Sequence, residues 1–180
     1  MTKLLSLLIT ILLISGCTSP TKVSAPGVVI SCGQIRLLES EDKSALMGCL
    51  DGSGEINLHQ LKGPLLINVW GSWCEGCKQE MPYFVELYQN PLFKSGQIQM
   101  LGINVEEKSK ENATNYIQKS GMSWPNLEDT SGISKTLFGP GVPVTRFIDE
   151  NGKTIDIKVG AYTNKKQLFN QVEKAFGIKL

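Results

Sequence analysis

Apolar and polar residues alternate along the chain in blocks that predict strands and helices. Residues 64–70 (PLLINVW) form a nearly continuous apolar run, which is typical of a strand buried on both faces of a sheet. Apolar residues then recur at helical spacing over 74–89, so we expect a helix there, ended by Asn90-Pro91. A strand, a short loop and a helix therefore follow one another in this part of the chain.

The same order of elements repeats downstream. Residues 97–105 predict a second strand and 109–120 a helix that ends at Gly121, and this alternation favours a parallel core. A right-handed crossover is the expected connection between the two strands. Another short helix is expected around 133–138.

The last part of the chain predicts a hairpin and a helix. Residues 142–149 and 153–159 flank the turn signal ENG, and 165–176 has the spacing of an amphipathic helix. Strand, helix, strand, helix, hairpin and helix is the element order of the thioredoxin fold. The sequence therefore predicts this α/β fold, with a central mixed sheet flanked by helices, an N-terminal extension and an insertion.

The pattern is weaker in the N-terminal extension. Residues 28–38 predict an extended segment or a hairpin around Gly33, whereas 39–47 is ambiguous. A turn at 51–54 and a short strand over 55–58 are expected next.

The first residues of the chain have the layout of a secretory signal. Lys3 supplies a positive charge, residues 4–14 are apolar, and two small residues follow. This apolar run is shorter than the roughly 20 residues that cross a membrane comfortably. We therefore expect residues 1–16 to be an export signal.

The stretch ISGC, which ends at Cys17, resembles the bacterial lipobox, in which the cysteine is lipidated and the signal is cut before it. The alternative is an uncleaved signal anchor with an incidental cysteine. After cleavage, residues 17–27 would form a lipidated tether rich in Ser, Thr and Pro, and 28–180 a single domain. The expected location is the extracytoplasmic side of the cell membrane.

Composition and charge exclude one class of partner. The 180 residues are 41% hydrophobic and 19% charged, which is ordinary for one globular domain. Without Lys3, 17 basic residues stand against 17 acidic ones, with no dense basic run. A nucleic-acid partner is therefore not expected.

Export would allow the remaining cysteines to form disulfides. Cys32, Cys49, Cys74 and Cys77 allow three connectivities, and the sequence alone does not choose among them. A structural zinc site would need two closely spaced pairs, whereas sixteen residues separate the first two cysteines and His59 is the only histidine. We therefore expect no metal and no other cofactor.

The spacing of Cys74 and Cys77 at the start of a helix favours thiol chemistry. Unpaired N–H groups and the positive end of the helix dipole lower the pKa of a thiol at this place. Cys74 would attack a substrate disulfide, and Cys77 would resolve the mixed disulfide. A purely structural bridge is the alternative, but it would close too small a loop to stabilise the fold much. A peroxiredoxin-type peroxidase and a Sco-type copper chaperone fit poorly, since each uses a different cysteine pattern.

The stretches "LLINVWGSWCEGCKQEMP" and "GVPVTRFIDENGK" resemble the TlpA/ResA-like family of membrane-tethered, extracytoplasmic thioredoxin-like proteins. The likeness extends over residues 47–176, and "GCLDGSGEINLHQLKG" resembles actinobacterial members in particular. Members of this family reduce disulfides, notably in apocytochrome c before haem attachment. The resemblance therefore implies a thiol-disulfide oxidoreductase with a role in cytochrome c maturation.

The resemblance also assigns residues around the cysteine pair. Trp73 matches the active-site tryptophan, a core aromatic residue being the alternative, and Pro82 matches a proline that kinks the active-site helix. Pro143 matches the cis-proline that faces the cysteines. In that arrangement the backbone of Val142 would pair with a substrate strand.

Two glutamates and a glycine are expected to tune the site. Glu75 should oppose the thiolate and make the site less oxidising, and Gly76 replaces a proline of many relatives. Glu80 matches an active-site glutamate and is the candidate base for Cys77, because Asn68 stands where thioredoxins carry a buried aspartate. For both glutamates the alternative is a solvated acid near a helix start.

Cys32 and Cys49 would then form a structural disulfide worth about 3 kcal/mol in the chain-entropy model. The alternative is a second redox pair that exchanges with the first.

The predicted function is reduction of disulfides in exported proteins such as apocytochrome c, with electrons from a membrane thiol relay. The alternatives are a disulfide donor to secreted proteins and a tethered binding module that uses the groove beside Pro143 without turnover.

Overall fold

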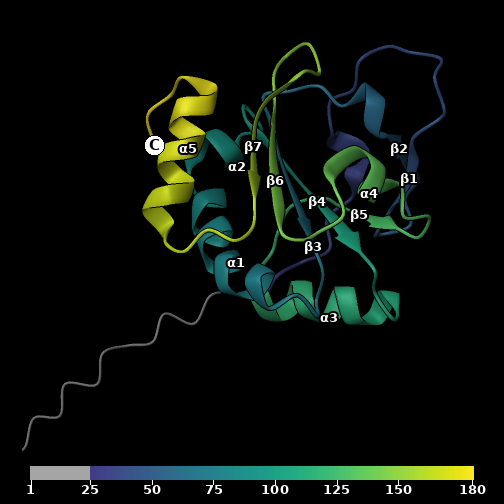
Figure 1. Ribbon diagram of the computed structural model, residues 1–180, viewed down its shortest axis with the longest axis horizontal. Coiled ribbons are helices and arrows are strands. Elements are labelled where there is room, and N and C mark those ends of the chain that lie inside the picture. Colours follow the sequence, from purple (N-terminus) through teal and green to yellow (C-terminus); the bar gives the residue numbers. More distant parts are fainter. Residues whose placement is uncertain (1–24) are drawn as a thin grey trace, which may run out of the picture.

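The computed structural model describes residues 25–180 (Figure 1). The expected export signal, the lipidation site Cys17 and most of the tether lie outside these residues. Within the described part of the chain, no helix combines the length and the apolar character that a membrane span requires.

One mixed sheet of seven strands forms the centre of the molecule, in the order β2-β1-β5-β4-β3-β6-β7. Strands β3, β4 and β5 run parallel, whereas β6 is antiparallel to β3 and β7, and β1 is antiparallel to β5 and β2. The strands are β1 (Leu46–Cys49), β2 (Glu55–Asn57), β3 (Leu65–Trp70), β4 (Gln99–Val105), β5 (Asn126–Asp129), β6 (Val144–Ile148) and β7 (Thr154–Val159).

Helices cover both faces of the sheet (Figure 1). They are α1 (Glu75–Tyr88), α2 (Pro91–Lys94), α3 (Lys110–Ser120), α4 (Ile133–Phe138) and α5 (Lys165–Phe176), with two 3-10 turns, η1 (Cys32–Gln34) and η2 (Leu58–Gln60). Leu66 and Trp70 of β3 pack toward α1, α3 and α5, and Ile67 and Val69 pack toward α4 and the N-terminal extension. Because successive side chains of a strand point to opposite faces, a strand covered on both sides is apolar at most positions, and in β3 only Asn68 is polar.

The main predicted elements are confirmed. The apolar run becomes β3, whose six residues are all buried, and the expected helix over 74–89 is α1. The helix over 109–120 is α3, capped by the Ser109 side chain and ended by Gly121 in a left-handed conformation. The hairpin of β6 and β7 and the last helix, α5, also form where expected.

Three details differ from the prediction. Of the two alternatives for residues 28–38, the hairpin around Gly33 is wrong. The segment runs extended apart from one 3-10 turn, η1, with bridges from Ile30 to Pro125 and from Leu37 to Leu61. Asn90 ends α1 as expected but also caps the new short helix α2 through its side chain. Strands β1 and β5 were not predicted.

Candidate active site

Cys74 and Cys77 lie at the junction of β3 and α1, and they form a disulfide. Cys74 is the N-cap of α1, and its Sγ accepts a hydrogen bond from the Cys77 backbone N–H at 3.1 Å. Their Cα atoms are 5.3 Å apart, and both side chains are almost fully buried. The first N–H groups of a helix stabilise a negative charge, so Cys74 occupies the place where a thiolate is favoured.

Glu80 lies one turn further along α1, on the same face as Cys77, and is fully buried. Its Oε1 accepts a hydrogen bond from Asn68 Nδ2 at 3.0 Å, and its Oε2 accepts one from the Tyr162 backbone N–H at 2.9 Å. Burial raises the pKa of Glu80 to about 7, although both hydrogen bonds and the charge of Lys158 favour the ionised form. This buried carboxyl can therefore gain or lose a proton near neutral pH. It is not a solvated acid.

Glu75 has the opposite environment. Its side chain is 74% exposed, and a carboxylate oxygen lies 3.6 Å from the Lys78 ammonium. Exposed charges interact weakly in water, and the lysine partly offsets the negative charge. The solvated alternative therefore describes Glu75 better than a strong influence on the thiolate.

Gly76 lies against the loop that contains the expected cis-proline. The Val142-Pro143 peptide is cis, as the resemblance implied. A Cβ atom at Gly76 would lie 3.4 Å from both Pro143 Cδ and Ala161 Cβ. The start of α1 and the proline loop are thus in close contact, which brings Pro143 next to the cysteine pair.

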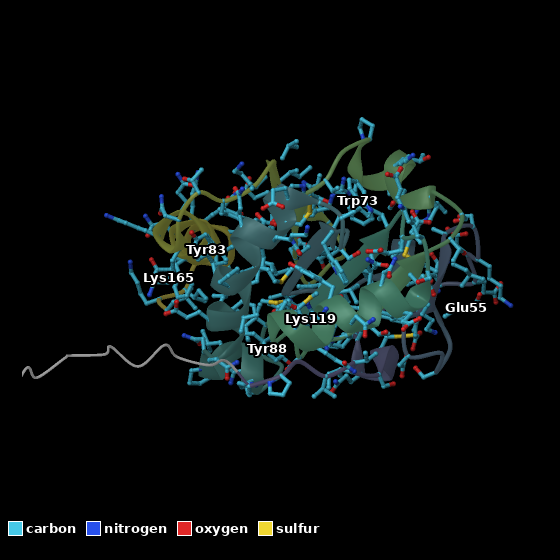
Figure 2. The ribbon with its side chains drawn as sticks, turned by 90° about the horizontal axis from the view of Figure 1, so that it is seen from below. Glu55, Trp73, Tyr83, Tyr88, Lys119 and Lys165 are labelled. Carbon is cyan, nitrogen blue, oxygen red and sulfur yellow. A yellow bond between two sulfur atoms is a disulfide. The ribbon has the colours of Figure 1, made fainter. Side chains whose placement is uncertain are left out.

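Trp73 lies on the outer side of the site rather than in the core (Figure 2). The residue is 49% exposed, and its Nε1 donates a hydrogen bond to the Val105 carbonyl at 3.3 Å. An exposed indole beside a reactive pair offers an apolar contact surface to an incoming protein. The alternative of a core aromatic residue does not describe this position.

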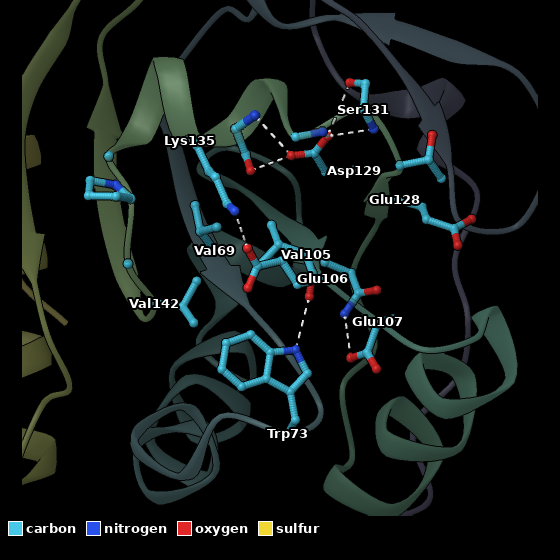
Figure 3. A pocket seen from close by; sticks show the side chains of 17 residues that line it. Val69, Trp73, Val105, Glu106, Glu107, Glu128, Asp129, Ser131, Lys135 and Val142 are labelled. Carbon is cyan, nitrogen blue, oxygen red and sulfur yellow. Dashed lines mark hydrogen bonds and ion pairs between the residues drawn. The ribbon is translucent and has the colours of Figure 1, made fainter.

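A groove of about 440 Å³ opens between Trp73, Val142 and the loops that follow β4 and β5 (Figure 3). Lys135 forms an ion pair with Glu106 on its wall. A groove beside Pro143 was expected from the sequence, whereas the contribution of the loops after β4 and β5 to it was not. The signal that could have found it is topological, because the carboxyl ends of parallel strands form the usual binding crevice of an open α/β sheet.

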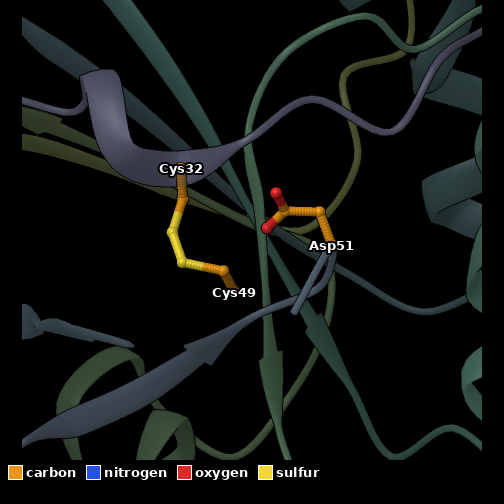
Figure 4. A group of neighbouring side chains, drawn as sticks. All are labelled: Cys32, Cys49 and Asp51. Carbon is orange, nitrogen blue, oxygen red and sulfur yellow. A yellow bond between two sulfur atoms is a disulfide. The ribbon is translucent and has the colours of Figure 1, made fainter. Parts of the chain in front are cut away.

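The second pair, Cys32 and Cys49, forms a disulfide between η1 and β1 (Figure 4). Both residues are buried, and the bond ties the N-terminal extension to the sheet. Asp51 lies close to both sulfur atoms. Within residues 25–180, Cys32, Cys49 and Asp51 are the one cluster of three or more potential metal ligands. Since the two sulfurs are bonded to each other, they offer no thiolate to a metal in this state.

Comparison with known proteins agrees with this geometry. Residues 42–157 match the AhpC/TSA family. The thiol-disulfide oxidoreductase ResA of Geobacillus thermodenitrificans is 34% identical over 102 residues, which is 56% of this chain and 57% of the relative. ResA of Bacillus thuringiensis (strain Al Hakam) is 31% identical over 122 residues, 67% of this chain and 68% of the relative.

A solved structure, the thioredoxin-related protein from Neisseria meningitidis serogroup B, superposes with a TM-score of 0.58 and 26% identity. The match covers 73% of this chain and 98% of that one. The chain spans 57% to 68% of the length of the two ResA relatives. These relatives come from Geobacillus and Bacillus, so the particular likeness to actinobacterial members stays a prediction. The chain belongs to the AhpC/TSA family, has the thioredoxin fold, and has ResA thiol-disulfide oxidoreductases among its relatives.

Proposed function

We propose that this protein is an extracytoplasmic thiol-disulfide oxidoreductase that reduces disulfides in exported proteins such as apocytochrome c. One observation carries the proposal. A disulfide at the start of α1 lies beside the cis-proline loop, on the same helix face as the buried carboxyl of Glu80.

The first step uses Cys74 of the reduced protein. Its thiolate attacks one sulfur of the substrate disulfide, so a bond forms between Cys74 Sγ and that sulfur while the substrate S–S bond breaks. The other substrate sulfur leaves as a thiolate. The N–H groups at the start of α1 stabilise the attacking thiolate, and Trp73 and Val142 provide contacts for the substrate chain beside it.

The second step uses Cys77 and Glu80. The ionised Glu80 takes the proton of the Cys77 thiol, and the Cys77 thiolate attacks Cys74 Sγ in the mixed disulfide. The second substrate sulfur leaves, and the substrate has gained two electrons and, after protonation, two thiols. Cys74 and Cys77 are oxidised to the disulfide seen in the structure. A dithiol protein at the membrane must then reduce this bond before another cycle.

Glu80 also favours the reducing direction. An ionised carboxylate on the same helix face disfavours a thiolate nearby, and a site whose reduced form is less stable donates electrons more readily. Glu75 was expected to exert this influence, but it is exposed and paired with Lys78. We therefore assign most of the tuning to Glu80.

The lipid anchor at Cys17 would keep the domain close to its membrane-bound electron donor. This part of the proposal rests on the sequence of the signal and lipobox. It predicts that the mature protein incorporates radiolabelled fatty acid and that Cys17→Ala abolishes the labelling.

The proposal is tested by trapping substrates in the native host. A Cys77→Ala variant should accumulate mixed disulfides on Cys74, which mass spectrometry of non-reduced complexes would identify. A Cys74→Ser, Cys77→Ala double variant is the matched control, because it keeps the binding surface but has no nucleophile. Apocytochrome c partners would support the maturation role. Other exported partners that become more oxidised in a deletion strain would support reduction of a different substrate.

Two results would overturn the proposal. Trapped partners that become more reduced in the deletion strain would show a disulfide donor instead. Equal recovery of the same partners by the double variant would show a binding module without turnover.

A further inference from the structure

The loop that follows β4 is tied to the segment just before Cys74. The Glu107 carboxylate accepts two hydrogen bonds from Ser72, from the backbone N–H to Oε1 at 2.5 Å and from the hydroxyl to Oε2 at 2.8 Å. One residue further on, Trp73 donates to the Val105 carbonyl (Figure 3). The residues that lead into the cysteine pair are therefore held by the end of the neighbouring strand.

The Glu107 carboxylate is itself held by the sheet. Its Oε1 also accepts a hydrogen bond from Asn104 Nδ2 at 3.0 Å. Asn104 is buried near the end of β4, directly opposite Trp70 in the register between β3 and β4. The buried Asn104 side chain thus fixes the position of the Glu107 carboxylate, which in turn binds Ser72.

The backbone conformation of the loop after β4 also indicates that this loop is held in a fixed position. Glu106 has φ of 54°, and within residues 25–180 it is the one residue other than glycine in the left-handed region. Such a conformation is unfavourable for a residue with a side chain and persists where the surroundings enforce it. A partly exposed ion pair between Glu106 and Lys135 links this turn to α4.

We propose that Glu107 is a positioning residue for thiol-disulfide exchange. By binding Ser72 it fixes the Gly71–Trp73 segment, and with it the indole of Trp73 and the N-cap geometry of Cys74. The Cys74 N–H donates to the Gly71 carbonyl at 3.1 Å, so displacement of this segment moves the N-cap residue directly. The inference rests on the proposed function, because it assigns Glu107 a role in that reaction.

The geometry suggests two informative substitutions. Glu107→Ala removes the acceptors of both Ser72 hydrogen bonds. Glu107→Gln can keep Oε1 for the Ser72 and Asn104 N–H groups, and its amide can donate to the Ser72 hydroxyl in place of accepting from it. Glu107→Gln should therefore keep the position of Ser72 that Glu107→Ala loses. Glu111→Ala is the matched control, since Glu111 is an exposed glutamate in the first turn of α3.

The first measurement is local and needs no substrate. In oxidised Glu107→Ala, the Ser72 amide should exchange with solvent at least about 10-fold faster, because it has lost its acceptor. Amides in the middle of β4 and α1 should keep their wild-type rates. Glu107→Gln and Glu111→Ala should leave the Ser72 rate near that of the wild type.

The second measurement follows the thiol. In the reduced protein, the pH profile for alkylation of Cys74 should lie at higher pH in Glu107→Ala than in Glu107→Gln. Both variants lack the negative charge, but only alanine leaves the thiolate less well aligned with the helix N–H groups. The value of kcat/KM for a peptide disulfide should fall about 10-fold or more, as expected for small misplacements of a reacting group. Ser72→Ala removes only the hydroxyl contact and should cause a smaller change in the same direction.

The outcomes separate this inference from the proposed function. Wild-type Ser72 exchange in Glu107→Ala, together with an alkylation profile that coincides with that of Glu107→Gln, would overturn the positioning role, whatever the activity. Wild-type protein that fails to reduce any disulfide would overturn the proposed function and leave the exchange result intact. If Glu107→Ala does not fold, an unchanged alkylation profile in Ser72→Ala would refute the inference instead.

Discussion

The two disulfides of this protein differ in their surroundings and not in their depth. All four cysteines are almost completely buried. Cys74 and Cys77 lie at the start of a 14-residue helix, on the face that also carries Glu80 and beside an open groove. Cys32 and Cys49 join a 3-10 turn to the short strand β1. Each pair belongs to an apolar core cluster, so the apolar surroundings do not distinguish them.

This comparison shows which features create a reactive pair. A helix start supplies N–H groups that stabilise a thiolate, and a carboxyl with a pKa near neutrality supplies a proton acceptor. The second pair has Asp51 nearby. Desolvation alone would raise the pKa of Asp51, but the hydrogen bonds from Ser53 and Ser31 together lower it. A carboxylate with a lowered pKa disfavours a thiolate and serves poorly as a base, so we expect this bond to remain closed.

The largest expected effect comes from removing the nucleophile. Cys74→Ser should lower the rate of disulfide reduction by about 1,000-fold or more, because an alcohol cannot replace the thiolate. The matched variant Cys32→Ser, Cys49→Ser should keep the rate per folded molecule within about 3-fold of the wild type, since neither residue lies at the site. Insulin reduction at one pH compares them. An equal loss in both variants would contradict the division of roles.

The second pair should affect stability instead. Its bond closes a loop across a sequence separation of 17 residues, so its loss should reduce the free energy of unfolding by about 3 kcal/mol in the chain-entropy model. Urea unfolding of Cys32→Ala, Cys49→Ala against the wild type measures this difference. Unchanged stability would mean that the bond does not stabilise the folded chain.

Glu80 should determine how both the exchange rate and the free energy of unfolding depend on pH. Glu80→Gln should lower the exchange rate about 10- to 100-fold and abolish the rise in rate with a midpoint near pH 7, because the proton acceptor is gone. The surface variant Glu86→Gln is the control, since Glu86 pairs with Lys165 on the outside of the helices. A rise near pH 7 that survives in Glu80→Gln would rule out this carboxyl as the base.

The same group makes a prediction for stability. The pKa of Glu80 is 4.5 in the unfolded chain and about 7 in the folded one, so the folded protein binds the extra proton between these values. Stability should therefore fall by about 3 kcal/mol as the pH rises from below 4.5 to above 7. Urea unfolding of the oxidised protein should show this slope, and Glu80→Gln should lack it.

Glu75 should produce the smallest effect. Because its side chain is exposed and paired with Lys78, Glu75→Gln should change the equilibrium constant with glutathione by no more than about 5-fold. A much larger change would restore Glu75 as the main determinant of redox direction. Glu86→Gln is again the control, because it removes a paired surface charge far from the thiols and should leave the equilibrium constant unchanged.

Much of the fold could be predicted because its central elements have long and regular patterns. The continuous apolar run of β3 indicates a buried strand, and the apolar spacing in α1 and α5 indicates helices. Strand β5 could not be found in this way, since its sequence NLED is short and mostly polar. Tertiary contacts explain it: Asn126 is buried, and its side-chain oxygen accepts a hydrogen bond from Trp70 Nε1 at 2.9 Å.

The site was predictable where the chemistry depends on neighbours in the chain. Cys74, Cys77 and Glu80 lie within less than two turns of a helix, so their spacing alone brings them together. Glu107 was missed because its partner Ser72 is 35 residues away and an isolated glutamate in a loop carries no local signal. The exposure of Glu75 likewise depends on how α1 packs, which its sequence position does not reveal.

The most direct test of the account is a redox titration that resolves both disulfides in one sample. The native, full-length protein would be equilibrated in thiol buffers of increasing reducing power, its free thiols alkylated, and each cysteine quantified by mass spectrometry. The account predicts that Cys74 and Cys77 become labelled together while Cys32 and Cys49 stay protected until the chain unfolds. Earlier labelling of Cys32 and Cys49 in the folded protein would contradict it.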